Sequence, residues 1–218
     1  MTEHIWYIEA LLLGQYNRGY APADDPALSE RENRNIRLKI LYRMRQGEPV
    51  APEELPETYV YNKGHPGTRL DIPFWWSAFL QVREDMAEVM RRFDLGRTLL
   101  HPITVELAGG KGEDRRYLTL ATSNIRSTID PDHSEGIHYG QKRRSALMCE
   151  GKVHPRVRAF RTAVEGPAIW TDPGVADTLF VNDALAQALL AEPYGRDLRL
   201  KQVRLVDERR GLPHPAGP

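Results

Sequence analysis

The stretch TLFVNDALAQAL, residues Thr178–Leu189, changes from the pattern of a β-strand to that of an α-helix partway along. Its first part combines β-branched, aromatic and apolar side chains, which favours a strand. Asn182 or Asp183 can then accept a hydrogen bond from the first turn of a helix, and Pro193 stops that helix. The stretch therefore predicts mixed α and β structure. The apolar positions of the helix are Leu185, Ala188 and Leu189.

A closing strand is predicted after this helix, over Leu198–Val206. Its apolar and polar residues alternate as in a half-buried strand, but the alternation slips phase between Leu200 and Val203. An extra residue in a strand produces such a slip, so we expect a β-bulge there. Beyond Glu208 the chain is rich in proline and glycine, and we expect residues 209–218 to form a flexible tail.

Upstream of this stretch, the sequence predicts a β-hairpin. Ile103, Val105 and Leu107 alternate with polar residues, and apolar residues return at Tyr117–Leu120 after a polar, glycine-rich tip. Another strand is expected over Val157–Val164. These segments indicate that strands dominate the second half of the chain.

The clearest helical pattern precedes this hairpin. Apolar residues recur at spacings of three and four, and charged residues lie between them. Gly96 is expected to end the helix in a conformation with positive φ. The aromatic run Phe74–Trp76 leads into the helix, and we expect it to pack in the core, with a ligand platform as the alternative. The apolar positions are Phe79, Val82, Met86, Val89, Met90 and Phe93.

The first 70 residues are predicted to contain a strand, a loop and a helix. Ile5–Leu13 predicts the strand, and Asn17–Pro26 predicts the loop. Ser29 and Glu32 have the spacing of a capping box, so a helix is expected to follow with arginines on its solvated face. A strand is the alternative, because Ile36, Leu38 and Ile40 also alternate. Thr58–Tyr61 is expected to form a short edge strand. The apolar side of the helix is expected to comprise Ile36, Ile40, Leu41 and Met44.

Together these patterns predict an α+β fold: a twisted, mostly antiparallel sheet with two to three packed helices in a single globular domain. We expect residues 1–70 to form an N-terminal strand, loop and helix region packed on the main domain. That main domain is expected to span residues 71–208. A chain of 218 residues can bury a sizeable core without disulfides.

The composition bounds the function. Lys plus Arg and Asp plus Glu are equal at 30 each, which gives a formal net charge of zero. A dedicated nucleic-acid binder usually carries a basic excess, so we expect no nucleic-acid partner. The single cysteine, Cys149, lies in an apolar run and fits a reducing compartment, with a reactive thiol as the alternative. The chain shows neither a signal-peptide pattern nor a membrane-length apolar run, so we expect a cytoplasmic protein without membrane contact.

The densest cluster of polar residues lies between Asp130 and His138. Its carboxylates and imidazoles could hold a divalent metal, which would make the protein a metal-dependent hydrolase. The spacing matches no established ligand motif, and a turn rich in Asp, Ser and Gly explains the same residues. The metal hypothesis rests on Asp130, Asp132, His133 and His138.

Other motifs argue against catalysis. Gly109–Gly112 lacks the frame and the following helix of a phosphate-binding loop, and no other established catalytic motif is present. We therefore expect a protein that is not an enzyme and needs neither cofactor nor metal. If its segment is helical, a stripe of basic residues could contact nucleic acid or an acidic protein, but surface charge balanced by the interspersed acids is the favoured explanation. That stripe comprises Arg31, Arg34, Arg37, Lys39, Arg43 and Arg45.

From about Asp71 onward the chain carries an ordered series of short blocks. The strongest is Thr178–Leu189, followed by Leu198–Val206. The order and spacing of the blocks resemble a family of bacterial immunity proteins, the family numbered eleven in polymorphic toxin systems and formerly a domain of unknown function. Asn182 stands where members of that family often carry serine, and both residues cap helices. The remaining blocks are Leu70–Pro73, Val82–Val89, Ile103–Glu106, Tyr117–Thr122, Ile129–Asp130 with Ser134, and Ala159–Arg161.

This resemblance implies a role in competition between bacteria. Proteins of the family act in the cytoplasm of the toxin-producing cell, where they bind the cognate toxin and block its activity. The resemblance thus implies a protein partner and no catalytic residues. Two alternatives stay open: the metal-dependent hydrolase, and an adaptor or chaperone that carries an effector to a secretion machine.

The surface that would contact a toxin is predicted from exposure and composition, not from the resemblance. Three segments are polar enough to be exposed: Asn17–Asp25, the hairpin tip Gly109–Asp114, and Asp132–Arg144. The candidate contact residues are Tyr16, Arg18, Tyr20, Asp24, Asp25, Lys111, Glu113, Asp114, Asp132, His133, Glu135, His138, Tyr139, Lys142 and Arg143.

Overall fold

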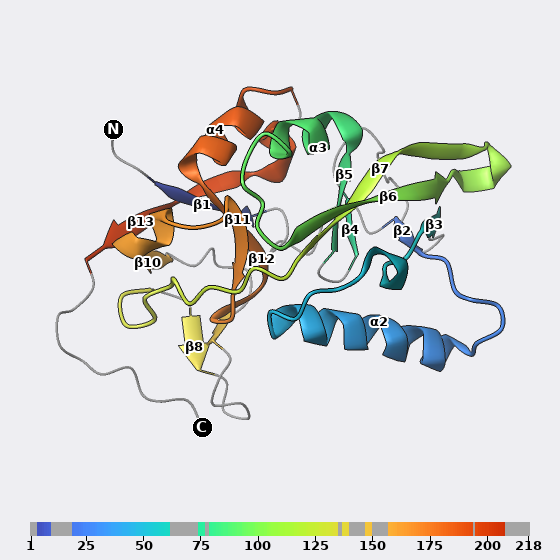
Figure 1. Cartoon of the computed structure of the whole chain (residues 1–218), viewed down its shortest axis with the longest axis horizontal. Coiled ribbons are helices and arrows are strands. Elements are labelled where there is room, and N and C mark those ends of the chain that lie inside the picture. Colours follow the sequence, from blue (N-terminus) through green and yellow to red (C-terminus); the bar gives the residue numbers. More distant parts are fainter. Residues whose placement is uncertain are drawn as a thin grey trace.

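The computed structural model is an α+β fold, as the sequence predicts (Figure 1). It describes residues 4–9, 19–61, 74–76, 79–134, 137–139, 147–149, 157–193 and 195–207. For residues 74–76, 110, 137–139, 147–149 and 176–177, only the backbone is described. The helices of this part of the chain are α2 (Glu30–Arg45), α3 (Glu84–Met90) and α4 (Asp183–Leu190).

One sheet has five strands in the order β10-β13-β1-β12-β11. The N-terminal strand β1 lies at its centre and pairs antiparallel with β12 and β13. The edge strand β10 pairs parallel with β13. The strands are β1 (Ile5–Ile8), β10 (Arg158–Phe160), β11 (Ile169–Asp172), β12 (Val175–Asn182) and β13 (Leu200–Val206).

A second sheet has six strands in the order β2-β3-β6-β7-β5-β4. The predicted hairpin is confirmed as the antiparallel pair β6 and β7, and only β3 and β6 pair parallel within this sheet. A short pair, β8 (Ile137–Tyr139) and β9 (Leu147–Cys149), forms a separate two-stranded sheet, and β9 contacts β12. The six strands are β2 (Tyr20–Pro22), β3 (Thr58–Tyr61), β4 (Phe74–Trp76), β5 (Phe79–Arg83), β6 (Thr98–Glu106) and β7 (Glu113–Thr122).

Two local predictions at the edge of this sheet are wrong. Residues Tyr20–Pro22, expected in a loop, form β2. Because β2 pairs with one side of β3 and β6 pairs with the other, Thr58–Tyr61 is an interior strand and not an edge strand. The N-terminal part of the chain thus supplies strands to both sheets.

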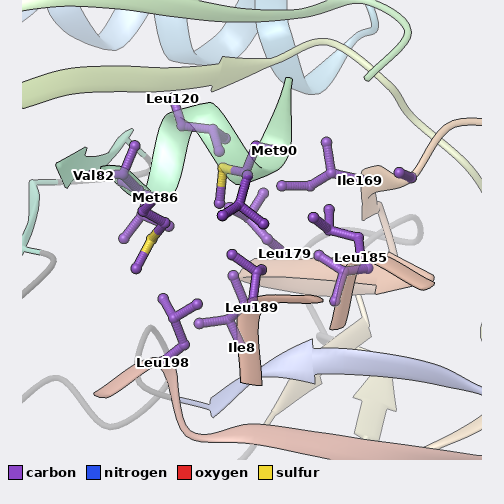
Figure 2. Close-up of a cluster of buried hydrophobic side chains, with 14 of the residues drawn as sticks. Ile8, Val82, Met86, Met90, Leu120, Ile169, Leu179, Leu185, Leu189 and Leu198 are labelled. Atoms are coloured by element: carbon purple, nitrogen blue, oxygen red, sulfur yellow. The ribbon is translucent and has the colours of Figure 1, made fainter. Parts of the chain in front are cut away.

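The main hydrophobic core lies between the two sheets, where α3 and α4 meet (Figure 2). Met86 and Met90 enter it from α3, and Leu185 and Leu189 enter it from α4. Burying a side chain of this size stabilises the fold by roughly 1.5–3 kcal/mol. The strands contribute Ile8, Leu80, Val82, Leu118, Leu120, Ile169, Leu179, Val181 and Leu200.

The opposite face of the five-stranded sheet is covered as well. Ile5, Trp170 and Phe180 pack there with Ala159 of β10 and Ala163. Both faces of this sheet are therefore buried, and its strands have no single polar face.

This double coverage explains the phase slip in β13. Leu200 belongs to the core between the sheets, whereas Val203 belongs to the cluster on the other face. The register of β13 against β1 runs from Leu200 to Val203 without a shift. The predicted bulge is therefore wrong, because apolar residues on both faces produce the same pattern.

The predicted helix from Phe79 to Phe93 is also too long. Residues Phe79–Arg83 form β5, and the helix begins only at Glu84. Gly96 has the expected positive φ of 55°, but it lies in the loop before β6 rather than at the helix end. A Cβ atom there would come within 2.7 Å of the Asn124 side chain, so glycine is required for close packing as well.

Both predicted helix caps are confirmed. The Ser29 hydroxyl accepts a hydrogen bond from the Glu32 backbone N–H, and the Glu32 carboxylate accepts one from the Ser29 backbone N–H. The Asn182 side chain accepts from the Leu185 N–H at 2.9 Å. Along the described part of the chain, no helix is both long and apolar enough to cross a membrane.

The underside of α2 covers one face of the six-stranded sheet. Ile40, Leu41 and Met44 pack there against Phe79 of β5 and Ala121 of β7. The other face of the same sheet turns toward α3 and the main core. The helix therefore lies across the sheet from α3, at the outside of the molecule (Figure 1).

Candidate partner-binding site

The loop after β2 is held firmly against α2. The Asn33 side chain accepts from the Asp25 backbone N–H at 2.9 Å and donates to the Asp25 carbonyl at 3.1 Å. Asp24 forms an ion pair with Arg37 of α2, with 2.8 Å between the Oδ1 and Nη1 atoms. Asp24 and Asp25 are exposed as predicted, and both are positioned by the helix.

The hairpin tip offers fewer exposed acids than the sequence predicts. Lys111 and Glu113 are exposed. Asp114, in contrast, is buried, because Arg116 folds over its carboxylate with contacts of 2.6 and 3.0 Å. The hydrogen bond from Arg116 holds the pKa of Asp114 below its ordinary value. The expected exposure of Asp114 is therefore wrong, because its carboxylate is already engaged inside the protein.

The expected exposure of Tyr20 is wrong as well, since its side chain is also buried. Its ring packs against that of Tyr61, with 5.8 Å between the centroids. Burial raises the pKa of Tyr20, and the nearby Tyr61 and Asp114 add to the effect. Strand β2 and the β6–β7 hairpin therefore meet through a buried cluster that contains Tyr20, Ile103 and Tyr117.

The third predicted segment lies elsewhere in the molecule. The hairpin β6–β7 extends toward one end and β8 lies toward the other (Figure 1). Asp130 is buried and organises a turn: its Oδ1 accepts from the Asp132 backbone N–H at 2.9 Å, and its Oδ2 lies 2.6 Å from His133 Nδ1. The Ser134 hydroxyl accepts a hydrogen bond from the Arg158 backbone N–H and so ties the turn to β10. Asp132 and His133 remain exposed.

The turn interpretation of this cluster accounts for its contacts. Among the described residues, no group of three or more potential ligands is arranged to hold a metal ion. His138 lies in β8, where only the backbone is described, as does Tyr139. The remaining candidate contact residues lie outside the described part of the chain: Tyr16, Arg18, Glu135, Lys142 and Arg143.

Two buried polar side chains elsewhere, Asp172 and Asn124, are engaged in structural contacts. Asp172 accepts hydrogen bonds from the backbone N–H groups of Thr128, Ile129 and Gly174, although burial still raises its pKa. The Asn124 side chain donates to the Leu95 and Ile169 carbonyl groups and so links the two sheets. The hydrogen bonds of these two side chains stabilise the fold, so these groups are not available to a substrate.

A row of polar side chains crosses the six-stranded sheet beneath α2. Gln81, Thr119 and His101 are in register on β5, β7 and β6. Gln81 donates to the Tyr59 hydroxyl at 2.9 Å, and burial raises the pKa of Tyr59 from 10.0 to about 12. A proton-transfer group for chemistry near neutral pH needs a pKa near 7, so Tyr59 is a structural group.

One surface feature was missed by the sequence predictions. Three large hydrophobic side chains are exposed in the part of the chain that the structure describes, and all three belong to α2. Ile36 is 50% exposed, Leu38 is 48% exposed and Tyr42 is 63% exposed. Ile36 was expected on the packed side of the helix. Leu38 and Tyr42 lie one turn apart, on the side of the helix opposite Ile40 and Met44. Their spacing of four residues is visible in the sequence and is the signal that could have revealed this pair.

Comparison with known proteins adds no relative. No model of a known protein family matches this chain, and no curated protein has a significantly similar sequence. The resemblance to immunity proteins therefore stays a prediction that rests on the order of its sequence blocks.

Proposed function

We propose that this protein is an immunity protein: it binds a cognate bacterial toxin in the cytoplasm and neutralises it by covering the toxin's active site. The proposal includes no catalytic step and no cofactor. Its support from the structure is the exposed apolar side of α2, and its support from the sequence is the ordered series of blocks.

The exposed apolar residues favour a protein partner. Leu38 and Tyr42 lie one turn apart on a rigid helix, so their side chains form one contiguous patch. Contiguous exposed apolar surface commonly marks a site of protein–protein contact, and tyrosine is enriched in such contacts. Folding alone does not require these two residues, because Ile40, Leu41 and Met44 already anchor the helix.

Most of the sequence blocks fall on elements other than α2. They fall on β5 with α3, on the β6–β7 hairpin, and on β12, α4 and β13, which together enclose the main core. The helix α2 lies outside them. We infer that the blocks hold the fold, while α2 and the adjoining loop face the toxin.

The mechanism we propose is occlusion. An interface of ordinary size buries roughly 800 Å² on each partner, enough to cover a substrate groove. Charged residues around the apolar patch speed the encounter and select the partner.

Co-expression with the protein encoded by the adjacent gene tests this function. We expect the toxin alone to arrest growth, the pair to restore growth, and the two proteins to co-purify. If the pair gives no protection and the two proteins form no complex, the proposal is refuted. A complex that leaves the toxin fully active in a purified assay would instead identify an adaptor or chaperone.

A further inference from the structure

The charges of α2 are unevenly distributed along the helix. Its two acidic residues, Glu30 and Glu32, both lie in the first turn. Every charged residue after them is basic. The helix thus presents a positive surface along most of its length, although the whole chain has a formal net charge of zero. These later basic residues are Arg34, Arg37, Lys39, Arg43 and Arg45.

Arg37 and Arg43 form ion pairs with acidic residues of the neighbouring loops. Arg37 pairs with Asp24 at 2.8 Å, and its side chain is largely buried. Arg43 pairs with Glu48 at 3.3 Å and also with Glu54. These three ion pairs link the helix to neighbouring loops and so contribute to its docking.

The outer side of α2 carries a stripe that combines charge and apolar surface. Arg31, Arg34, Leu38, Tyr42 and Arg45 follow one another at spacings of three and four, so they lie along one side of the helix. All five are exposed. We call these five residues the outer stripe. Its centre is apolar and both of its ends are basic; the exposed Lys39 adjoins Leu38.

We propose that the outer stripe docks onto an acidic protein surface, with Leu38 and Tyr42 entering an apolar recess and the cations pairing with carboxylates around it. An apolar centre with a charged rim is the usual anatomy of a specific protein interface. This inference rests on the proposed function, and it identifies the surface of the immunity protein and the charge of the toxin face that it covers.

The stripe fits an acidic protein better than the other occupants. A nucleic acid would be held mainly by cations over phosphates. Tyr42 can stack on a base, but the aliphatic Leu38 beside it cannot, and the chain has no overall basic excess. A second copy of this chain would bring a basic stripe against its own counterpart, and like charges across an interface repel.

The test is to measure binding of the purified toxin from the adjacent gene to two variants of the full-length protein. Arg34→Glu with Lys39→Glu reverses charge beside the apolar centre. Leu38→Ser with Tyr42→Ser removes that centre. We expect each double variant to weaken binding by about tenfold or more, because central contacts dominate interface energy. The charge variant should also show a weaker dependence of affinity on salt.

Matched controls separate the stripe from general effects. Arg92→Glu with Arg204→Glu makes the same change in charge at exposed positions elsewhere. Ile36→Ser removes a comparably exposed apolar residue that lies about 200° around the helix from Leu38. Both controls should bind within about threefold of the wild-type protein, since distant surface residues contribute little. Circular dichroism and thermal melting verify that every variant is folded.

Three possible results would contradict the proposals in different ways. Wild-type protein that fails to bind the toxin would refute the proposed function and this inference with it. Wild-type binding that both stripe variants retain would refute the inference alone and leave the proposed function standing. Unimpaired toxin binding by the charge variant, together with loss of binding to a duplex DNA probe, would assign the stripe to nucleic acid and likewise refute the inference.

Discussion

Helices α4 and α2 begin in the same way but lie in different surroundings. Each starts at a side-chain cap, Asn182 in one and Ser29 in the other. Helix α4 then buries Leu185 and Leu189 in the core between the two sheets (Figure 2). Helix α2 covers a single face of one sheet and leaves apolar residues exposed on its outer side.

The difference follows from where charge falls along each helix. After Asp183, α4 carries no charged residue, so it can be enclosed on several sides without burying a charge. Helix α2 carries a charged residue in every turn, which restricts burial to one side. The packing of the core does not account for the exposed apolar residues on this helix. They indicate that α4 belongs to the scaffold and that α2 provides a surface.

The largest test of this comparison is the removal of one leucine from each helix. We expect Leu185→Ala to lower the free energy of unfolding by about 2–5 kcal/mol, because it leaves a cavity in a closed core. Leu38→Ala should change it by less than about 0.5 kcal/mol, since the side chain is half exposed. Urea denaturation followed by circular dichroism measures both. Equal losses would show that α2 is as deeply built into the fold as α4.

Alkaline pH tests how well α2 seals the sheet beneath it. The pKa of Tyr59 is raised from 10.0 to about 12 by burial, so the folded protein holds this proton more tightly than the unfolded chain. The resulting stability is complete below pH 10 and is lost as the pH rises toward 12, at about 1.4 kcal/mol for each pH unit. The free energy of unfolding should therefore fall more steeply across this range for the wild type than for Tyr59→Phe.

Denaturation curves at pH 8, 10 and 11 provide the measurement. Near pH 8 the phenylalanine variant should be less stable by about 1 kcal/mol, because Gln81 loses its hydrogen bond to the Tyr59 hydroxyl. The difference in the free energy of unfolding between the two proteins should be smaller at pH 11. Parallel loss of stability in both proteins would mean that water reaches Tyr59 and that the underside of α2 is open.

The fold was predictable wherever one local signal determined it. Ser29 and Asn182 cap their helices as their side chains predict, and the alternation after Ile103 yields the hairpin. The errors at Phe79 and Leu200 have a common physical cause. Both residues lie in strands with apolar contacts on both faces, where alternation disappears and helical spacing arises by coincidence.

The contact surface was less predictable than the fold. Polar composition marks Tyr20 and Asp114 as exposed, yet both are buried in one sheet, on strands that are distant in sequence. The exposed pair Leu38 and Tyr42 went unnoticed because their neighbours Ile40 and Leu41 supply a more obvious apolar side. Only the direction in which the helix docks distinguishes the two sides, and that direction depends on tertiary structure.

The smallest test concerns the caps themselves. Replacing either Ser29 or Asn182 by alanine removes a hydrogen bond to the first turn and costs about 1 kcal/mol of helix stability. Because α4 lies inside the main core, Asn182→Ala should lower the global free energy of unfolding by that amount. Ser29→Ala should act locally, with faster amide exchange at Glu32 and little change in the global value. Amide hydrogen exchange read residue by residue separates the two, and equally global losses would contradict the division into scaffold and surface.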